Sequence, residues 1–428
     1  MTHRETIEYL YKLRLFGTKL GLENTFRLAK AAGSPQDQLR FIHVAGTNGK
    51  GSVCAYLESI YRSAGYKVGM FTSPHLVQFG ERMQIQRSPI APQDLVRQVE
   101  QLQHAIADWP EDTCPTFFEF ITVLALNYFA EQSCDIVIWE TGMGGRLDAT
   151  NIVQPECSII TNISADHQAW LGSELTDIAR EKAGIIKPGR PVVTTESKDN
   201  LLEVIRTTAK EQQANFHRVE TRLVPAGIKP GLHGPHQQLN ASAAVKAVEL
   251  LQPTFPVSGT TITEAIQSTR LPGRFQILEW KGRRVILDVA HNLAGIQTVV
   301  DSWKACFGSQ TCELIFATLN DKPWRECLER LAPLCETIHL VPAQSQRAEC
   351  TSVMAEHLNR MAPGKVVAEY DRVEEALKKI QSNKHPILIT GSFYLIGGVL
   401  PLLDPVNYPR EEVSLNEWGA VLNGEFRH

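Results

Sequence analysis

The amino-acid sequence predicts an α/β protein of two domains, the first of which is built around a phosphate-binding loop. The chain has 428 residues, which is more than one ordinary hydrophobic core accommodates. Short apolar runs rich in β-branched residues alternate with helical patterns, as expected of parallel sheets whose two faces are covered by helices. The first of these runs begins at Phe41 and ends in a glycine-rich turn.

Composition and charge indicate a globular protein of the cytoplasm. Hydrophobic residues make up 43% and charged residues 21% of the chain, and the formal net charge of -4 provides no basic excess for nucleic acid. The first residues lack the apolar core of a signal peptide, and no apolar stretch approaches the ~20 residues that span a bilayer. The 9 cysteines form no Cys-x-x-Cys pair, which is typical of reduced thiols. We therefore expect neither a membrane nor a nucleic-acid partner.

The segment from residue 41 to residue 63 has the order strand, glycine turn, helix that binds phosphate. Glycines let backbone N–H groups curve around an anion, the helix N-terminus adds partial positive charge, a lysine neutralises phosphate, and a hydroxyl reaches Mg2+. The common pattern has glycine where Val44 stands, and it lacks the extra glycine that this chain has between lysine and hydroxyl. The segment still predicts a nucleoside triphosphate site. Its residues are Gly46, Thr47, Asn48, Gly49, Lys50, Gly51 and Ser52.

Four further strands are predicted in the first domain, and polar residues stand at their carboxyl ends. These strands span residues 67–71, 135–140, 157–161 and 191–195. A long apolar helix is predicted at 115–131. Ser73 follows the first of the four strands, Glu140 closes the second, and His167 comes shortly after the third. Because the carboxyl ends of parallel strands share one edge, we expect these groups to meet the phosphate loop there.

Each of these polar residues also has a structural interpretation. Glu140 could accept hydrogen bonds from the glycine turn that follows it, or it could supply the carboxylate oxygen that Mg2+ prefers. A histidine such as His167 is more often structural than a ligand, and only its place at the shared edge favours a site. Lys182 lies on an apolar helix face, where a lysine either extends its ammonium to water or is desolvated and able to react with CO2 to form a carbamate. Helical spacing alone favours the extended ammonium.

A second α/β pattern follows a candidate linker at residues 271–274. Its predicted strands span residues 284–288, 313–317, 337–341, 365–368 and 387–390. Asp288 ends the first of them, and Asn292 follows shortly after it. These two side chains could cap the next helix or have a functional role, and the sequence favours neither explanation.

A series of motifs in a fixed order covers nearly the whole chain. The motifs are 46–52, 72–76, Glu81-Arg82, 140–151, 166–167, 180–187, His236-Gln237 with Asn240, 272–275 and 288–292. Together they resemble the bacterial folylpolyglutamate synthase/dihydrofolate synthase family of the Mur ligase superfamily. The phosphate loop alone would fit other Mur-type ligases equally well.

The resemblance implies an ATP-dependent ligase that joins L-glutamate to dihydropteroate, to a (tetrahydro)folyl-(poly)glutamate, or to both, through an acyl phosphate. It implies a P-loop parallel-sheet ATPase domain at 1–271, followed by a smaller Rossmann-like α/β domain at 272–428 that is the glutamate-ligase domain. ATP, two Mg2+ ions and a CO2-derived carbamate on Lys182 are the implied cofactors, which reverses the preference that helical spacing gives. We expect a monomer that acts on small molecules.

The resemblance also implies roles for individual residues. The implied metal ligands are Ser52, Ser73, Glu140, His167 and Lys182. Besides the phosphate loop, the implied ATP contacts are Asn240, Arg274 and Asp288. The implied catalytic residues are Lys50, His167, Lys182, Asp288 and His291. The implied pterin contacts are Lys19, Leu20, Gly21, Leu22, Thr116, Phe117, Phe118, Glu119, Leu147, Asp148 and Ala149. Thr116 and Glu119 also match a capping box, which by itself accounts for both residue types.

The chain departs from the family pattern in the second domain, which the family uses to place the incoming amino acid. Leu293 and Ala294 stand where the family usually has Pro and His, and Pro323 stands where it usually has Asp. Three alternatives remain: a Mur-type amino-acid ligase of peptidoglycan precursor synthesis, a P-loop switch or phosphotransferase, and a binding module without catalysis. Glutamate-independent ATP turnover would favour the second of these, and the ligand-type residues at the metal positions argue against the third.

Overall fold

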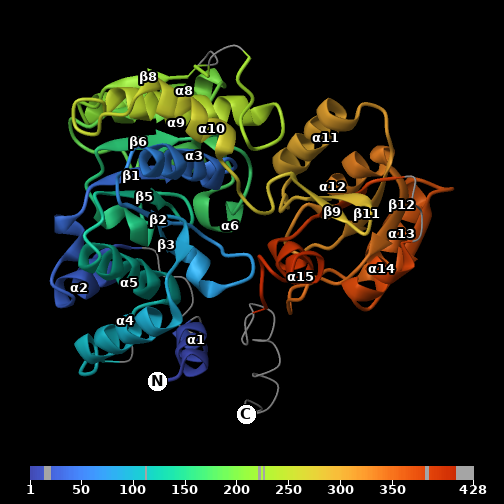
Figure 1. The fold of residues 1–428 in the computed structure, drawn as a ribbon, viewed down its shortest axis with the longest axis horizontal. Helices are drawn as coiled ribbons and strands as arrows, with labels where there is room; N and C mark the ends of the chain where they lie inside the picture. The colour runs from blue at the N-terminus through green and yellow to red at the C-terminus, as the bar shows by residue number, and fades with distance from the viewer. Residues whose placement is uncertain (14–20, 111–112, 220–222, 225–226, 381–384, 411–428) are drawn as a thin grey trace. The chain divides into compact units, whose positions relative to one another are not determined.

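The computed structural model describes residues 1–13, 21–110, 113–219, 223–224, 227–380 and 385–410. Its contacts divide the chain into two compact units, which are drawn in Figure 1. Unit 1 comprises Met1–His75, Phe79–Gly231 and Gln238–Thr269, and unit 2 comprises Leu76–Gln78, Leu232–Gln237 and Arg270–His428. A division of the sequence at 271/272 stays a prediction.

Unit 1 is built on an eight-stranded sheet with the order β4-β3-β2-β5-β1-β6-β7-β8. The strands are β1 (Phe41–Ala45), β2 (Val68–Phe71), β3 (Met83–Ile85), β4 (Ser88–Pro89), β5 (Ile136–Glu140), β6 (Cys157–Ile160), β7 (Val192–Thr194) and β8 (Phe216–Arg218). From β2 to β8 every neighbouring pair is parallel, and the five predicted strands lie where the sequence places them.

The sheet departs from parallel pairing at one edge, where β3 pairs antiparallel with β2 and β4 pairs antiparallel with β3. The turn between β3 and β4 contains Gln86 and Arg87, both with positive φ. Two successive residues of this kind form the tight turn that suits the twist of a β-hairpin. Neither strand is a continuous apolar run, since β3 reads Met-Gln-Ile and β4 reads Ser-Pro, so the sequence does not predict them.

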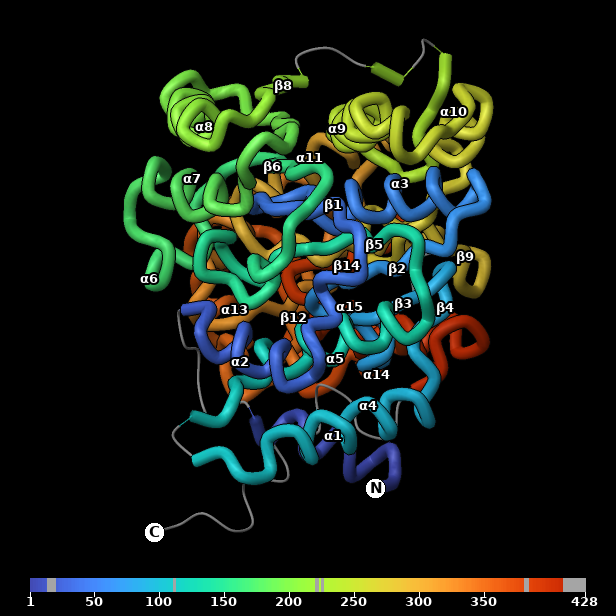
Figure 2. The backbone as a smooth tube through the Cα atoms, turned by 90° about the vertical axis from the view of Figure 1, so that its left-hand side faces the viewer, coloured from blue at the N-terminus to red at the C-terminus, as the bar shows by residue number. Residues whose placement is uncertain are grey.

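Helices cover both faces of this sheet, as the sequence predicts. The helices of unit 1 are α1 (His3–Lys12), α2 (Glu23–Ala31), α3 (Lys50–Ser63), α4 (Pro92–Ala105), α5 (Phe117–Glu131), α6 (Gln168–Leu171), α7 (Leu175–Ala183), α8 (Asp199–Glu211), α9 (His236–Leu250, whose first two residues belong to unit 2) and α10 (Gly259–Ser268), with 3-10 turns η2 (Pro35–Gln38), η3 (Phe79–Arg82) and η5 (Ala149–Ile152). Helix α3 packs against β1, β2 and β5. Figure 1 and Figure 2 place α5 on the opposite face, where α1, α2 and α4 pack against it.

Unit 2 contains a six-stranded sheet with the order β13-β12-β11-β14-β10-β9. Its strands are β9 (Gln276–Trp280), β10 (Arg283–Leu287), β11 (Cys312–Phe316), β12 (Cys335–Leu340), β13 (Val366–Glu369) and β14 (Ile387–Thr390), and its helices are α11 (Leu293–Phe307), α12 (Trp324–Leu331), α13 (Thr351–Met361), α14 (Val373–Lys379) and α15 (Phe393–Leu403), with the 3-10 turn η6 (Ala332–Leu334). The five predicted strands are present and parallel, and only β9 pairs antiparallel, with β10. Buried Trp303 and Trp324 belong to the core on one face of this sheet.

The described residues include no helix that is both long and apolar enough to cross a membrane.

Candidate functional site

The glycine-rich loop joins β1 to α3, and Lys50 is the first residue of that helix. Its Nζ donates to the carbonyl oxygens of Gly46 at 3.1 Å and Thr47 at 3.4 Å. Ser52 is buried in the first helical turn. The lysine is therefore held over the loop, at the helix end whose N–H groups and partial positive charge attract an anion.

Two glycines of the loop are required by close neighbours. Gly46 has φ 151°, and a Cβ there would lie 1.7 Å from Thr161 Oγ1. Gly49 has φ 91°, and a Cβ there would lie 2.8 Å from Asn240 Oδ1. Asn240, an expected ATP contact that lies far away in the sequence, is thus brought against the loop.

Glu140 and Ser73 meet beside the loop. Glu140 pairs with Val44 across the parallel strands β5 and β1. Its carboxylate is buried and accepts a hydrogen bond from the Ser73 backbone N–H at 3.1 Å. Burial raises the pKa of the Cys54 thiol in α3, Glu140 raises it further and Lys50 lowers it. Both charged groups therefore lie near this thiol. The structure therefore gathers these groups at the carboxyl edge of the sheet, as the sequence predicts.

Lys182 lies in α7 and is 3% exposed, so the interpretation that helical spacing favours, an ammonium extended to water, is wrong. The turn after β5 closes over this part of the helix: a Cβ on Gly145 would lie 3.0 Å from the Lys182 carbonyl oxygen. Burial lowers the pKa of Lys182 to about 7, with a further lowering by Lys50, while Asp166 and Asp148 raise it. Burial therefore favours the neutral amine over the ammonium. The electrostatic effect of Lys50 also places Lys182 near the phosphate loop.

His167 is the exposed member of the expected metal ligands. It precedes α6, has a positive φ of 52°, and its Nε2 lies 3.9 Å from Asp166 Oδ1. Because Asp166 acts on the pKa of Lys182, the segment that carries His167 lies at the same edge as the lysine.

The donor set suits a metal ion that arrives with phosphate. In the described part of the chain no group of three or more His, Cys, Asp and Glu side chains could hold a metal by itself. Mg2+ usually takes one or two carboxylates from the protein and completes its shell with substrate phosphates and waters. Glu140 supplies a buried carboxylate, and Ser52 and Ser73 supply hydroxyl oxygens, so these residues fit Mg2+ bound together with a nucleotide.

Thr116 and Glu119 form the capping box that their spacing suggests. Thr116 N donates to Glu119 Oε2 at 2.7 Å, and Glu119 N donates to Thr116 Oγ1 at 3.4 Å. Both side chains are buried at the start of α5. The capping box is therefore present, and the pterin contacts expected at Thr116, Phe117, Phe118 and Glu119 stay a prediction.

The remaining expected pterin contacts lie around the turn after β5 or before α2. Phe118 packs on this turn, since a Cβ on Gly142 would lie 2.4 Å from its Cζ. Asp148 is buried, which raises its pKa, and it accepts hydrogen bonds from Thr150 and from the Met143 backbone N–H at 2.8 Å. Leu147 is half-buried and Ala149 is buried in η5; Gly21 and Leu22 precede α2, and Lys19 and Leu20 lie outside the described residues.

A second group of expected site residues gathers within unit 2. The Asp288 carboxylate accepts from the Phe275 backbone N–H at 2.8 Å, which fixes the linker at the end of β10. Burial raises the pKa of Asp288 and Arg274 opposes this effect. The Arg274 guanidinium lies 5.2 Å and the His291 ring 5.6 Å from the centre of the Phe393 ring.

The capping interpretation is correct for Asn292 and wrong for Asp288. Asn292 Oδ1 accepts from the Gly295 backbone N–H at 2.8 Å and caps α11. Asp288 instead accepts from the backbone N–H groups of Ala290 and Phe275, so it organises the turn and the linker rather than a helix end.

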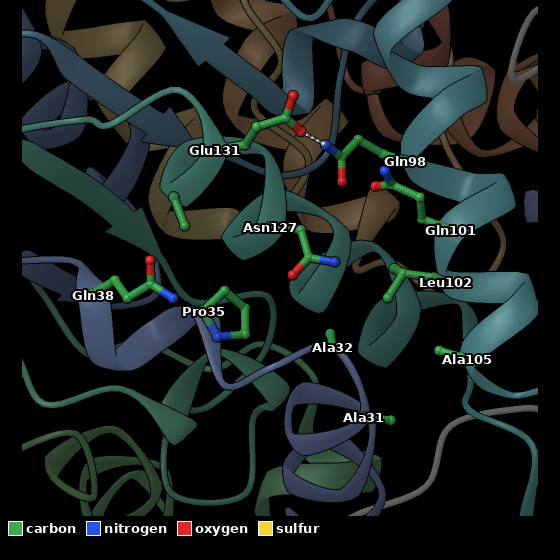
Figure 3. Close-up of a pocket in the computed structure, with 11 residues that line it drawn as sticks. Ala31, Ala32, Pro35, Gln38, Gln98, Gln101, Leu102, Ala105, Asn127 and Glu131 are labelled. Atoms are coloured by element: carbon green, nitrogen blue, oxygen red, sulfur yellow. Dashed lines mark hydrogen bonds between the residues drawn. The ribbon is translucent and has the colours of Figure 1, made fainter.

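A polar pocket of about 390 Å3 lies at the other end of the strands of unit 1, between α2, η2, α4 and α5 (Figure 3). Pro35 and Gln38 of its wall precede β1, and Glu131 precedes β5. Since the phosphate loop follows the carboxyl end of β1, this pocket is separate from the site described above.

Sequence reasoning missed the residues that anchor the phosphate loop. Thr161 Oγ1 donates to the Asn48 carbonyl oxygen at 2.7 Å, and Asn162 Oδ1 accepts from the Asn48 N–H at 2.8 Å. Both residues directly follow β6, so the rule that polar groups gather at carboxyl strand ends could have found them. No comparable signal points to Phe393.

Two protein-family models match most of the chain. The model of the Mur ligase middle domain matches residues 44–248, and that of the Mur ligase glutamate ligase domain matches residues 273–393. The dihydrofolate synthase/folylpolyglutamate synthase of Bacillus subtilis is 35% identical over 413 residues, covering 90% of this chain and 95% of that protein. The Escherichia coli enzyme of the same name is 32% identical, covering 93% and 94%.

Solved structures extend the similarity to the fold. The folylpolyglutamate synthase of Thermotoga maritima matches with a TM-score of 0.82 and 32% identity, covering 94% of this chain and 96% of that one. Escherichia coli FolC in complex with DHPP and ADP matches with a TM-score of 0.84 and 30% identity, covering 94% and 98%. The chain therefore belongs to the folylpolyglutamate synthase/dihydrofolate synthase family of Mur ligases, which are ATP-dependent enzymes that add glutamate to dihydropteroate or folates.

Proposed function

We propose that this chain transfers the γ-phosphoryl group of ATP to a carboxylate of dihydropteroate or of a folylglutamate, and joins the acyl phosphate to L-glutamate. A carboxylate does not condense with an amine in water, because its leaving group would be oxide. In the first step a carboxylate oxygen attacks the γ-phosphorus and ADP leaves. In the second, the glutamate nitrogen attacks the acyl carbon, phosphate leaves and the nitrogen loses a proton. One observation carries the proposal: Lys50, Glu140 and the desolvated Lys182 gather at one sheet edge.

The phosphate loop supports the first step. Negative charge develops on the transferred phosphoryl group and on the departing ADP, and fixed donors aimed at that charge lower the barrier. Lys50 stands at the N-terminus of α3 over the loop carbonyl groups. It is placed to follow the developing charge while the loop N–H groups hold the phosphates that do not react.

Five side chains are proposed to hold two Mg2+ ions. They are Ser52, Ser73, Glu140, His167 and a carbamate on Lys182. Bound metal would neutralise phosphate charge and orient the triphosphate. The buried Glu140 carboxylate is already oriented by the Ser73 N–H, so it needs little rearrangement to act as a ligand. The neutral amine that a carbamate requires is available because burial lowers the pKa of Lys182 to about 7.

The acceptor is proposed to bind beside the turn after β5. Phe118 in α5 and Leu147 after β5 are half-buried. Buried Phe117 and Ala149 lie close to them in sequence, so apolar side chains for a planar ring lie around the turn that follows Glu140. A relative such as the Bacillus subtilis protein carries both activities in its name, whereas the Lacticaseibacillus casei relative is named folylpolyglutamate synthase alone. We propose that this chain uses both acceptors.

Unit 2 is proposed to supply the remaining ATP contacts and to place glutamate. Arg274, Asp288 and His291 gather around Phe393 and the linker. An acyl phosphate must be shielded from water, so residues that surround the reacting groups are needed for the second step.

Phosphate release tests the proposed function. The purified chain is assayed with ATP, Mg2+ and L-glutamate, with dihydropteroate or tetrahydrofolate as acceptor. We expect release that requires both glutamate and an acceptor, and a product longer by one glutamate by mass spectrometry. ATP turnover that needs no glutamate would contradict the ligase and favour a phosphotransferase. Turnover with only one acceptor would reject the dual specificity.

Replacing Glu140 with glutamine is expected to weaken the dependence on Mg2+. The amide keeps the size of the side chain but loses the charge that attracts the ion, so the Mg2+ concentration for half-maximal rate should rise about tenfold or more. Glu131→Gln, in the separate pocket of Figure 3, is the matched control and should leave the titration unchanged. An unaltered Mg2+ titration in Glu140→Gln would reject this residue as a ligand.

A further inference from the structure

In unit 1 a network of hydrogen bonds connects the phosphate loop to the segment that follows β6. Asn162 takes part with both of its oxygens: its Oδ1 accepts from the Asn48 N–H at 2.8 Å and its carbonyl oxygen from the Thr47 N–H at 2.8 Å. Thr47 also exchanges hydrogen bonds with Ser164, accepting from its N–H at 3.0 Å and donating to its carbonyl oxygen at 3.1 Å. The hydroxyl of Thr161 donates to the Asn48 carbonyl oxygen at 2.7 Å.

The anchoring segment is itself fixed in place. The Ile163 N–H donates to Glu196 Oε2 at 2.8 Å, and Glu196 is buried after β7, where its other oxygen accepts from the N–H groups of Ser197 and Lys198. Asn162 therefore presents its oxygens to the loop from a rigid support. Just beyond it the chain reaches Asp166 and His167.

We propose that Asn162 is a positioning residue that sets the phosphate loop for the triphosphate. The N–H groups of Thr47 and Asn48 are occupied by Asn162, so they are not free for phosphate. Their orientation fixes the peptide planes at the start of the loop, and through them the direction of the N–H groups that follow toward α3. Donors held in place before the ligand arrives need no rearrangement when charge develops. This role of Asn162 rests on the proposed ATP-dependent function. In it, Asn162 acts through the phosphate loop and does not contact the substrate.

The proposal predicts a selective loss of phosphate recognition in Asn162→Ala. The variant keeps the backbone hydrogen bond from Thr47 but loses the one from Asn48. ADP affinity should fall about tenfold, the effect of one lost hydrogen bond on a preorganised site, whereas adenosine affinity should not change. The KM for ATP should rise and the KM for glutamate should stay as in the wild type. Calorimetric titration and initial rates measure these quantities.

The matched control is Asn127→Ala. Asn127 is also a half-buried asparagine of unit 1, but it lines the separate pocket of Figure 3. This variant should bind ADP as the wild type does. A merely structural role for Asn162 would lower the melting temperature and leave the ratio of ADP to adenosine affinity unchanged. A folded Asn162→Ala protein that binds ADP like the wild type would overturn the proposal.

A second pair of variants keeps the proposal testable if Asn162→Ala does not fold. Thr161→Ser keeps the hydroxyl that donates to the Asn48 carbonyl oxygen, and Thr161→Val removes it at similar size. We expect weakened ADP binding in Thr161→Val and near-normal binding in Thr161→Ser. Equal ADP affinity in the two would reject the anchoring role. These binding measurements need no turnover. If the wild type shows no glutamate-dependent phosphate release, the proposed function is overturned, but the effect of Asn162 and Thr161 on ADP binding still stands or fails by itself.

Discussion

Replacing Lys50 with alanine is expected to reduce ATP turnover by about 100-fold or more while the protein stays folded. The ammonium donates to the loop carbonyl groups of Gly46 and Thr47, and removing one such donor from developing phosphoryl charge typically costs about two to three orders of magnitude. The two hydrogen bonds it makes are to partly buried loop oxygens, so the expected loss of stability is only about 1 kcal/mol. Phosphate release and thermal unfolding measure the two effects.

The matched control for Lys50→Ala is Lys210→Ala. Lys210 is an exposed lysine near the end of α8, and its removal should change neither rate nor melting temperature. A Lys50→Ala protein that retains near-normal ligation would refute the assignment of the phosphate loop.

Lys182→Met is expected to abolish ligation, because methionine cannot form the proposed carbamate. In the wild type, 13C-labelled bicarbonate with Mg2+ and ATP should give a carbamate 13C NMR signal that Lys182→Met lacks. Lys187→Met is the control, because Lys187 is also a partly buried lysine whose pKa burial lowers, and its Nζ donates to the Asn151 carbonyl oxygen at 3.1 Å. The control should retain the carbamate signal. If the wild type shows no such signal under these conditions, Lys182 is not carbamylated.

The lowered pKa of Lys182 also predicts the direction of two pH effects. Carbamate formation needs the neutral amine, so at limiting CO2 activity should fall as the pH drops below about 7, and added bicarbonate should restore it. Without ligands, the unfolded chain holds this proton up to its ordinary pKa of 10.5, whereas the folded chain releases it at about 7. The unfolded state therefore binds more protons between these values, and the contribution of Lys182 to stability improves as pH rises through that window. Lys182→Met should therefore stabilise the ligand-free protein, and more so at pH 6 than at pH 9. Chemical denaturation of both proteins at pH 6 and pH 9 measures the difference.

The parallel strands and the phosphate loop follow from local sequence. Five predicted strands of unit 1 and five of unit 2 are present because continuous apolar β-branched runs have few stable alternatives once helices cover both faces of a sheet. The edge hairpin of β3 and β4 is not predicted, and its turn depends on the positive φ values of Gln86 and Arg87. Polar residues interrupt both strands, whereas the equally short β7 is a run of Val192, Val193 and Thr194.

The individual site residues divide in a similar way. Helical spacing predicts that Lys182 lies on an apolar face. It does not predict which residues cover the end of the side chain. The tertiary structure leaves that side chain 3% exposed, and the turn at Gly145, which follows a different strand, approaches the Lys182 backbone. The capping box of Thr116 and Glu119 was predictable because both partners belong to one helical turn. The sequence does not separate the roles of Asp288 and Asn292. Asn292 accepts from Gly295 in its own helix, which a local pattern can predict, whereas Asp288 accepts from Phe275 in the linker, which it cannot.

The sequence by itself determined the fold class, the glycine turn with its lysine, and the family that these motifs resemble. Each of these depends on residues within a few positions of one another, so local patterns suffice to establish it. Only the tertiary structure decided that Lys182 is desolvated beside Lys50, that Asn240 lies against Gly49, and that Asn162 anchors the loop. Burial and hydrogen-bond partners of this kind are set by which distant strands become neighbours in the sheet, and no single segment of the chain encodes that neighbourhood.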